Sequence, residues 1–227
     1  MPFKGLTWFR FKEHLRKTAP IYIVGFIVCV LLTNLIYTTT TPRTPMDREV
    51  LVYLVDVYTD PEPLNAHAED ILAYGQTIDE TLEEVRFESI QFNDPEQDYT
   101  SAYLIMARMS VGDGDVYLAS ATAADYLLGA EIGMRLDEYL DEGWMEEYGL
   151  EPVTYTSPDS SETDIVALRL DDVDGLVDLG CMNNEGACLF IAGNGTNVDT
   201  SMQVVEYIVQ QLMEGNYAPA EGVESAD

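Results

Sequence analysis

Few side chains in this 227-residue sequence have the types and spacing that catalysis or metal binding requires. After residue 37 the one histidine is His67, near an expected helix start, where a histidine usually serves as a surface or capping residue. The segment Gly112–Asp115 ("GDGD") resembles part of a calcium loop but lacks the later ligands and the closing glutamate, so we interpret it as a turn. The sequence has no G-x-S-x-G, H-E-x-x-H, phosphate-loop or dinucleotide-binding motif. We therefore expect a protein that is not an enzyme, with no catalytic residue, metal site or cofactor.

Two cysteines offer the remaining chemistry. Cys181 and Cys188 flank a polar segment in "LGCMNNEGACLF", with strand-like residues on both sides. This pattern favours a hairpin closed by a disulfide in an oxidising compartment, and closing so short a loop would stabilise the fold by about 2–3 kcal/mol. The alternative is two reduced cysteines; a metal site is not expected because no histidine lies nearby. Cys29 lies in an apolar block, where we expect it only to pack.

That apolar block, Ala19–Tyr37, contains no charged residue. As a helix it would extend roughly 28 Å, close to the hydrocarbon thickness of a bilayer. The residues before it include one acid, Glu13, and five basic residues: Lys4, Arg10, Lys12, Arg16 and Lys17. By the positive-inside rule, the pattern predicts a single-pass membrane protein with a cytoplasmic N-terminus and an extracytoplasmic C-terminal domain.

The segments around the block follow from this topology. We expect a basic cytoplasmic segment at 1–18, a transmembrane signal anchor at 19–37, a short extended stalk at 38–48, an α/β domain at 49–215 and a disordered acidic tail at 216–227. A cleaved signal peptide fits less well, because the block is long and no small-x-small site follows it. A buried soluble helix is a third interpretation.

Composition limits the partners of the part after residue 37. That part has six arginines, no lysine and 40 acidic residues, a net charge of −34. Such a domain is repelled by nucleic acid and by anionic membrane surfaces, so neither is expected as a partner. The simplest explanation of the acidity is a solvated surface, and cation binding or adaptation to high salt are alternatives. With 47% hydrophobic residues the chain can form the core of one ordinary domain.

Hydrophobic periodicity predicts alternating strands and helices. Residues 49–58 form a nearly continuous apolar run, typical of a strand buried on both faces. Residues 99–110 carry a helical stripe that includes Tyr99, Tyr103 and Met106. Further strands are expected at 85–92, 115–119, 165–170 and 187–193, and further helices at 66–74, from Thr122 and at 201–213. This order predicts an α/β domain with a largely parallel sheet and flanking helices.

The segments "VLVYLVDVYTD", "VRFESIQFND" and "VGDGDVYLASATAADYLL", followed by "MRLDEYLDE", resemble the first lobe of extracellular solute-binding proteins. The matching positions are Gly112, Asp115 and Val116, then Leu136, Asp137 and Tyr139, and the similarity extends weakly over 49–213. The resemblance implies a periplasmic-binding-protein-like fold with a reduced second lobe. It also implies ligand contacts at the carboxyl ends of the first and third strands: Asp56, Tyr58, Thr59, Asp60, Ser120 and Thr122.

Two functions are compatible with these observations. The first is a membrane-anchored, extracytoplasmic, solute-binding-like module that is accessory to a transporter or sensor and binds a small molecule. The second is a cell-envelope interaction or assembly protein that uses the same fold without a small ligand. A cleft lined by Asp56, Tyr58, Ser120 and Thr122 would favour the first function, whereas an exposed apolar patch elsewhere would favour the second.

Overall fold

The computed structural model describes residues 8–40, 44–93, 99–130, 135–137, 139–140, 142–156, 163–192 and 197–217. The chain divides into two compact units, residues 1–43 and 44–227. Most of the predicted acidic tail and part of the predicted stalk lie outside the described residues.

The first unit contains helix α1 (Trp8–Thr40), which covers the predicted anchor and continues into the predicted stalk. The large apolar side chains from Ile21 to Ile36 are all between 46% and 71% exposed. Within the described part of the chain, no helix combines the length and the hydropathy that crossing a membrane requires. The anchor at 19–37 therefore stays a prediction.

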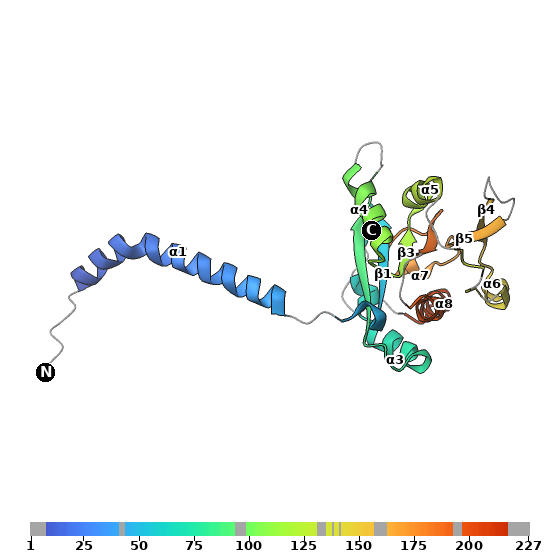
Figure 1. Ribbon diagram of the computed structural model, residues 1–227, viewed down its shortest axis with the longest axis horizontal. Coiled ribbons are helices and arrows are strands. Elements are labelled where there is room, and N and C mark those ends of the chain that lie inside the picture. The colour runs from blue at the N-terminus through green and yellow to red at the C-terminus, as the bar shows by residue number, and fades with distance from the viewer. Residues whose placement is uncertain are drawn as a thin grey trace. The chain divides into compact units, whose positions relative to one another are not determined.

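The second unit is built on one six-stranded mixed sheet with the order β2-β1-β3-β6-β5-β4 (Figure 1). Its strands are β1 (Glu49–Asp56), β2 (Glu84–Gln91), β3 (Val116–Ala119), β4 (Pro152–Thr156), β5 (Thr163–Arg169) and β6 (Cys188–Ile191). β1 runs parallel to β2 and to β3, whereas β6 is antiparallel to β3 and β5, and β4 is antiparallel to β5. The expected parallel sheet is thus correct only for the first three strands.

Helices cover both faces of this sheet (Figure 1). Buried residues of α3 (Ala68–Ile78), α6 (Glu142–Tyr148) and α8 (Val198–Met213) belong to the hydrophobic cluster on one face. Buried residues of α4 (Tyr99–Val111) and α5 (Ala121–Gly129) belong to the cluster on the other face. The remaining helical segments are short: η1 (Met46–Arg48), α2 (Glu62–Asn65) and α7 (Gly175–Asp178).

The reduced second lobe expected from the resemblance is not formed. Residues after 150 contribute β4, β5 and β6 to the same sheet as β1, and residues 44–227 form a single compact unit. β4 was not expected from the sequence, because its residues lie in a polar segment and its side chains are exposed or half-buried. The physical consequence is that there are no two lobes here to close on a ligand.

Both outer strands carry features that oppose pairing with another chain. On β2, the Asn65 side chain occupies the free backbone groups of Phe87: its Nδ2 donates to the Phe87 carbonyl (2.9 Å) and its Oδ1 accepts from the Phe87 N–H (3.0 Å). β4 begins with Pro152 and changes register after Val153. Such edges are poor sites for strand addition.

Candidate functional site

The carboxyl ends of β1 and β3 lie side by side, as the predicted ligand site requires. Val55 pairs with Ala119 in register, and the Ser120 N–H donates to the Val55 carbonyl at 2.8 Å. The Phe92 N–H donates to the Asp56 carbonyl at 3.0 Å, which brings the end of β2 to the same edge. Asp56 and Ser120 are therefore neighbours at the edge where open α/β sheets commonly bind ligands.

Ser120 lies at the start of helix α5 but does not make the side-chain hydrogen bond that is usual for a serine at such a position. It is 7% exposed and occupies the N-cap position of α5, but its hydroxyl does not cap the helix. Asp56 is half-buried, and its Oδ1 accepts a hydrogen bond from the next residue, Val57, at 2.7 Å. These two side chains and the first N–H groups of α5 are the part of the predicted site that the fold brings together.

The other predicted ligand residues do not join them. Asp60 Oδ1 accepts from the Glu62 N–H at 3.0 Å at the start of α2, and the Asp60 N–H donates to the Cys181 carbonyl at 2.9 Å. Tyr58 is 85% exposed, Thr59 is half-buried and Thr122 is exposed in the first turn of α5. Asp60 is thus engaged in holding the loop before α2, and Tyr58 and Thr122 face solvent.

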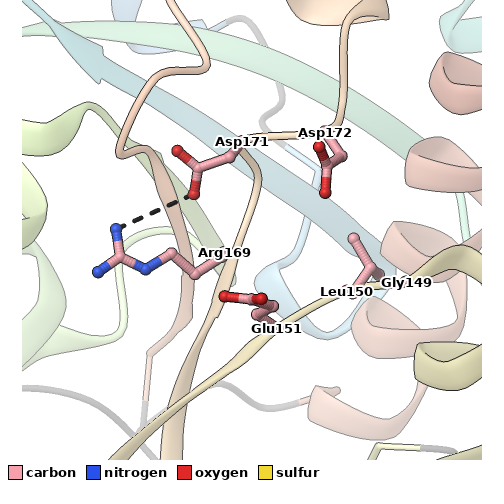
Figure 2. Close-up of a pocket in the computed structure, with 6 residues that line it drawn as sticks. All are labelled: Gly149, Leu150, Glu151, Arg169, Asp171 and Asp172. Atoms are coloured by element: carbon pink, nitrogen blue, oxygen red, sulfur yellow. Dashed lines mark ion pairs between the residues drawn. The ribbon is translucent and has the colours of Figure 1, made fainter.

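A cavity of about 200 Å³ lies further along the same edge, where β5 ends and β4 begins (Figure 2). It is lined by Gly149, Leu150, Glu151, Arg169, Asp171 and Asp172, and by none of the predicted ligand residues. Asp171 holds the neighbouring loop: its Oδ1 accepts from the Gly186 N–H at 2.6 Å, and its carbonyl accepts from Asn184 Nδ2 at 2.8 Å. Among the described residues, no group of three or more His, Cys, Asp or Glu side chains is arranged to hold a metal ion.

The predicted disulfide is absent from the structure, where Cys181 and Cys188 are free, buried thiols. The segment before Cys181 is the one-turn helix α7 rather than a strand, so no hairpin forms. Cys181 packs in the cluster on the α3 and α8 face, and Cys188, at the start of β6, packs in the cluster on the α4 and α5 face. Burial, with the Asp60 charge second, raises the pKa of Cys181 to about 12, and burial also raises the pKa of Cys188.

His67 lies at a helix start, as predicted, but its side chain is half-buried and does not cap the helix. It precedes the first residue of α3 and stacks on Tyr217, with ring centroids 4.4 Å apart. Its imidazole is therefore accounted for by packing.

The sequence interpretation missed an exposed apolar surface on α4. Tyr99 (79% exposed), Tyr103 (77%) and Val111 (72%) project to solvent, and Leu104 is 42% exposed between them. The core-facing side is instead formed by Ser101, Ala102, Ile105 and Met109. We call the exposed apolar residues Tyr99, Tyr103, Leu104 and Val111 the α4 face; the polar residues Thr100 and Ser110 of this helix are also exposed. The signal in the sequence was a helix with apolar residues on all sides and no acid, in a chain with 41 acids.

Contacts on the inner side hold α4 against the sheet. The Arg108 guanidinium lies 4.8 Å from the centroid of the Tyr53 ring and donates to the Tyr53 hydroxyl. Tyr53 in turn stacks on Tyr117, with centroids 5.3 Å apart. Burial raises the pKa of Tyr53 to about 12. These contacts connect the inner side of α4 to the sheet.

No protein-family model, no curated protein and no solved structure matches this chain.

Proposed function

We propose that this protein is a non-enzymatic, membrane-anchored interaction module of the cell envelope, and that the α4 face is its contact surface. The exposed α4 face carries this proposal. Of the two functions that the sequence suggests, we favour the interaction protein over the solute-binding module, because the fold has one compact α/β unit and exposes an apolar helix face.

The chemistry of the α4 face supports a protein contact. Interface centres are depleted in charge and enriched in tyrosine relative to other surfaces. α4 has no acidic residue, and its one charged residue, Arg108, lies near acids of the same chain: Glu88 at 3.8 Å and Asp113 at 3.7 Å. Four exposed apolar side chains on one acid-free helix of a strongly acidic domain are a surface that another molecule could cover.

The exposure of α1 supports the membrane part of the proposal. Its stretch Ala19–Tyr37 has no charged residue, and the large apolar side chains from Ile21 to Ile36 are 46% to 71% exposed, a surface that a bilayer would cover. The five basic residues before Ala19 and the acidic chain after residue 37 favour an extracytoplasmic α/β unit.

The charge substitution Leu104→Asp tests this function. In mild-detergent extracts of the native membrane we expect the wild-type chain to migrate in a complex larger than one copy. The assembled fraction of the variant should be at least about tenfold lower, because an unpaired carboxylate would be buried in an apolar contact. Native electrophoresis measures the assembled fraction, and the thermal midpoint verifies that the α/β unit remains folded.

Val177→Asp is the matched control, because Val177 is an apolar side chain of similar exposure, 49%, on α7. It should leave the complex intact. A complex that resists Leu104→Asp, or that both substitutions disrupt equally, would argue against the α4 face as the contact surface.

A second candidate function, binding of a small solute, is favoured by the position of Asp56 at the strand end next to the buried Ser120, at the start of α5. Thermal unfolding against pooled sugars, amino acids, peptides and divalent cations tests it. A ligand at 100 times its dissociation constant adds about 2.7 kcal/mol to the free energy of unfolding, which raises the midpoint by several degrees. Asp56→Ala should abolish such a shift, whereas Thr122→Ala, at an exposed position, should preserve it. If no pool shifts the midpoint, this function is excluded for those ligand classes.

A further inference from the structure

We infer that the loop of residues 183–186 is a lid over the start of α5, latched by Asp171, and that its opening controls access to Ser120. We call this loop the β6 lid, because it directly precedes that strand. The inference does not depend on the α4 face. It concerns the sheet edge at which the second candidate function would bind a solute, and it names what controls entry there.

The β6 lid lies against the first residue of α5. Cys188, which begins β6, pairs antiparallel with Ala119, so the residues before Cys188 are at the same edge as Ser120. A Cβ built on Gly186 would lie 2.9 Å from the Cβ of Ala121 and 3.7 Å from its Cα. Ala121 directly follows Ser120, which is only 7% exposed although it ends a strand. The position of the lid accounts for this burial.

Hydrogen bonds, rather than apolar packing, hold the lid closed. Asp171 Oδ1 accepts from the Gly186 N–H at 2.6 Å, and the Asp171 carbonyl accepts from Asn184 Nδ2 at 2.8 Å. Asn183 and Glu185 are exposed, so the lid buries no apolar side chain. A segment that lacks buried apolar contacts opens at a low cost in free energy compared with the core. Asp171 is therefore the main latch.

The two ends of the lid are fixed in the core. Met182 and Ala187 are 5% and 0% exposed, and both belong to the hydrophobic cluster on the α3 and α8 face. The Ala187 carbonyl accepts from the Leu170 N–H at 2.9 Å, which ties the second end to the chain after β5. Opening is therefore confined to the four residues between these ends and leaves the sheet intact.

The thiol of Cys188 provides a native reporter of lid opening. Its Sγ donates to the Gly186 carbonyl at 3.8 Å, so the lid covers it directly. Cys181 is also a buried thiol but packs in the cluster on the other face of the sheet, where the lid does not cover it. Alkylation of Cys188 without alkylation of Cys181 thus reports opening of the lid, whereas equal alkylation reports unfolding of the whole unit.

Asp171→Ala tests the latch in the full-length protein, in mild detergent and with the exposed Cys29 replaced by alanine. Iodoacetamide is the probe, and mass spectrometry measures the rate at each cysteine. We expect Cys188 to react at least tenfold faster than in the native lid, because the Gly186 N–H loses its carboxylate acceptor, while the Cys181 rate is unchanged. Hydrogen exchange of the first N–H groups of α5 should accelerate with it, because Ser120 and Ala121 become accessible.

Asp171→Asn is the matched control for charge. Burial raises the pKa of Cys188, and the Asp171 charge raises it further, so loss of that charge by itself favours the reactive thiolate. Asparagine removes the charge and keeps an oxygen for the Gly186 N–H. Its Cys188 rate should stay within about threefold of the native rate.

Gly186→Ala opens the lid from its other contact. Its φ of +70° disfavours a side chain, and the added Cβ would collide with Ala121. Gly180→Ala is the control, because Gly180 has nearly the same φ, +71°, but a Cβ there would meet nothing within 4 Å. We expect Gly186→Ala to accelerate alkylation of Cys188 at least tenfold more than Gly180→Ala does.

Four outcomes would each overturn the inference. They are an unchanged Cys188 rate in both Asp171→Ala and Gly186→Ala, equal acceleration at Cys181, equal rates in Asp171→Asn and Asp171→Ala, and faster alkylation of Cys188 without faster exchange at the start of α5. The last outcome would mean that the loop opens without covering Ser120. None of these measurements involves the α4 face, so failure of the lid leaves the proposed interaction function in place.

Discussion

Gly175→Ala should destabilise the α/β unit by about 3 kcal/mol or more, the largest effect that we expect from adding a single methyl group to this chain. A Cβ at this position would lie 2.4 Å from the Leu212 carbonyl oxygen and 2.9 Å from its C and Cα atoms. These are backbone atoms of α8, whose side chains fill the core, so they have no room to move. The short helix α7 would have to separate from α8. Urea unfolding followed by circular dichroism measures the loss.

Gly129→Ala separates this collision from the general effect of replacing a helical glycine. Gly129 ends α5, and a Cβ there would meet nothing within 4 Å. This substitution should be neutral or should stabilise the unit by up to about 1 kcal/mol, because alanine favours the helix. Similar unfolding midpoints for the two variants would contradict the packing of α7 against α8.

Asp115→Asn should remove a pH-dependent loss of stability that the native chain carries. Asp115 is 7% exposed, and its Oδ2 accepts a hydrogen bond from the Leu51 N–H at 2.9 Å. Burial raises the pKa of Asp115 from 3.8 to about 6, against the lowering effect of that hydrogen bond, and the nearby Glu49 charge raises it further. The folded chain therefore keeps this proton over a pH range in which the unfolded chain has already released it.

The direction of the effect follows from this difference in proton binding. Between about pH 4 and pH 6 the folded state binds the extra proton, so stability falls as the pH rises through this window and levels off above it. The shift corresponds to about 3 kcal/mol. Asparagine cannot ionise and still offers an oxygen to Leu51. Relative to the native chain, the variant should thus gain about 2 kcal/mol between pH 4 and pH 7, because part of the total lies below pH 4.

Asp79→Asn provides a control of opposite sign. Hydrogen bonds from the Thr81 hydroxyl (2.7 Å) and the Thr81 N–H (2.8 Å) lower the pKa of Asp79. Its contribution to stability is present above the ordinary carboxyl pKa and is lost as the pH falls. Compared with the native chain, the difference in unfolding free energy between pH 7 and pH 4 should therefore become more positive in Asp115→Asn and more negative in Asp79→Asn. A parallel change would mean that overall charge, rather than the site, sets the pH dependence.

The candidate site was predictable only in part. The strand ends that place Asp56 beside Ser120 follow from two apolar runs, and both runs are strands in the structure. Whether a polar residue at such an end faces a ligand, caps a helix or faces solvent depends on neighbours distant in sequence. Asp60, for example, holds α2 and contacts the backbone of Cys181. The α4 face was missed because apolar residues occur on all sides of that helix, and the periodicity therefore does not identify the inner side.

The sequence by itself determined the elements whose pattern reflects burial at short range. The continuous apolar run Val50–Val55 forms a fully buried strand, and the predicted face of α8, Val204, Val205, Ile208, Val209 and Leu212, is buried as expected. Tertiary structure alone decided the direction of the later strands, because burial on two faces imposes the same apolar pattern on parallel and antiparallel pairs. Tertiary structure also determined where the two cysteines lie. Cys188, at the start of β6, packs on one face of the sheet, and Cys181 packs on the other. The small residues Ser101 and Ala102 of α4 face the sheet, and both tyrosines of the helix are exposed. Packing against the sheet determines this orientation, and the local sequence pattern does not predict it.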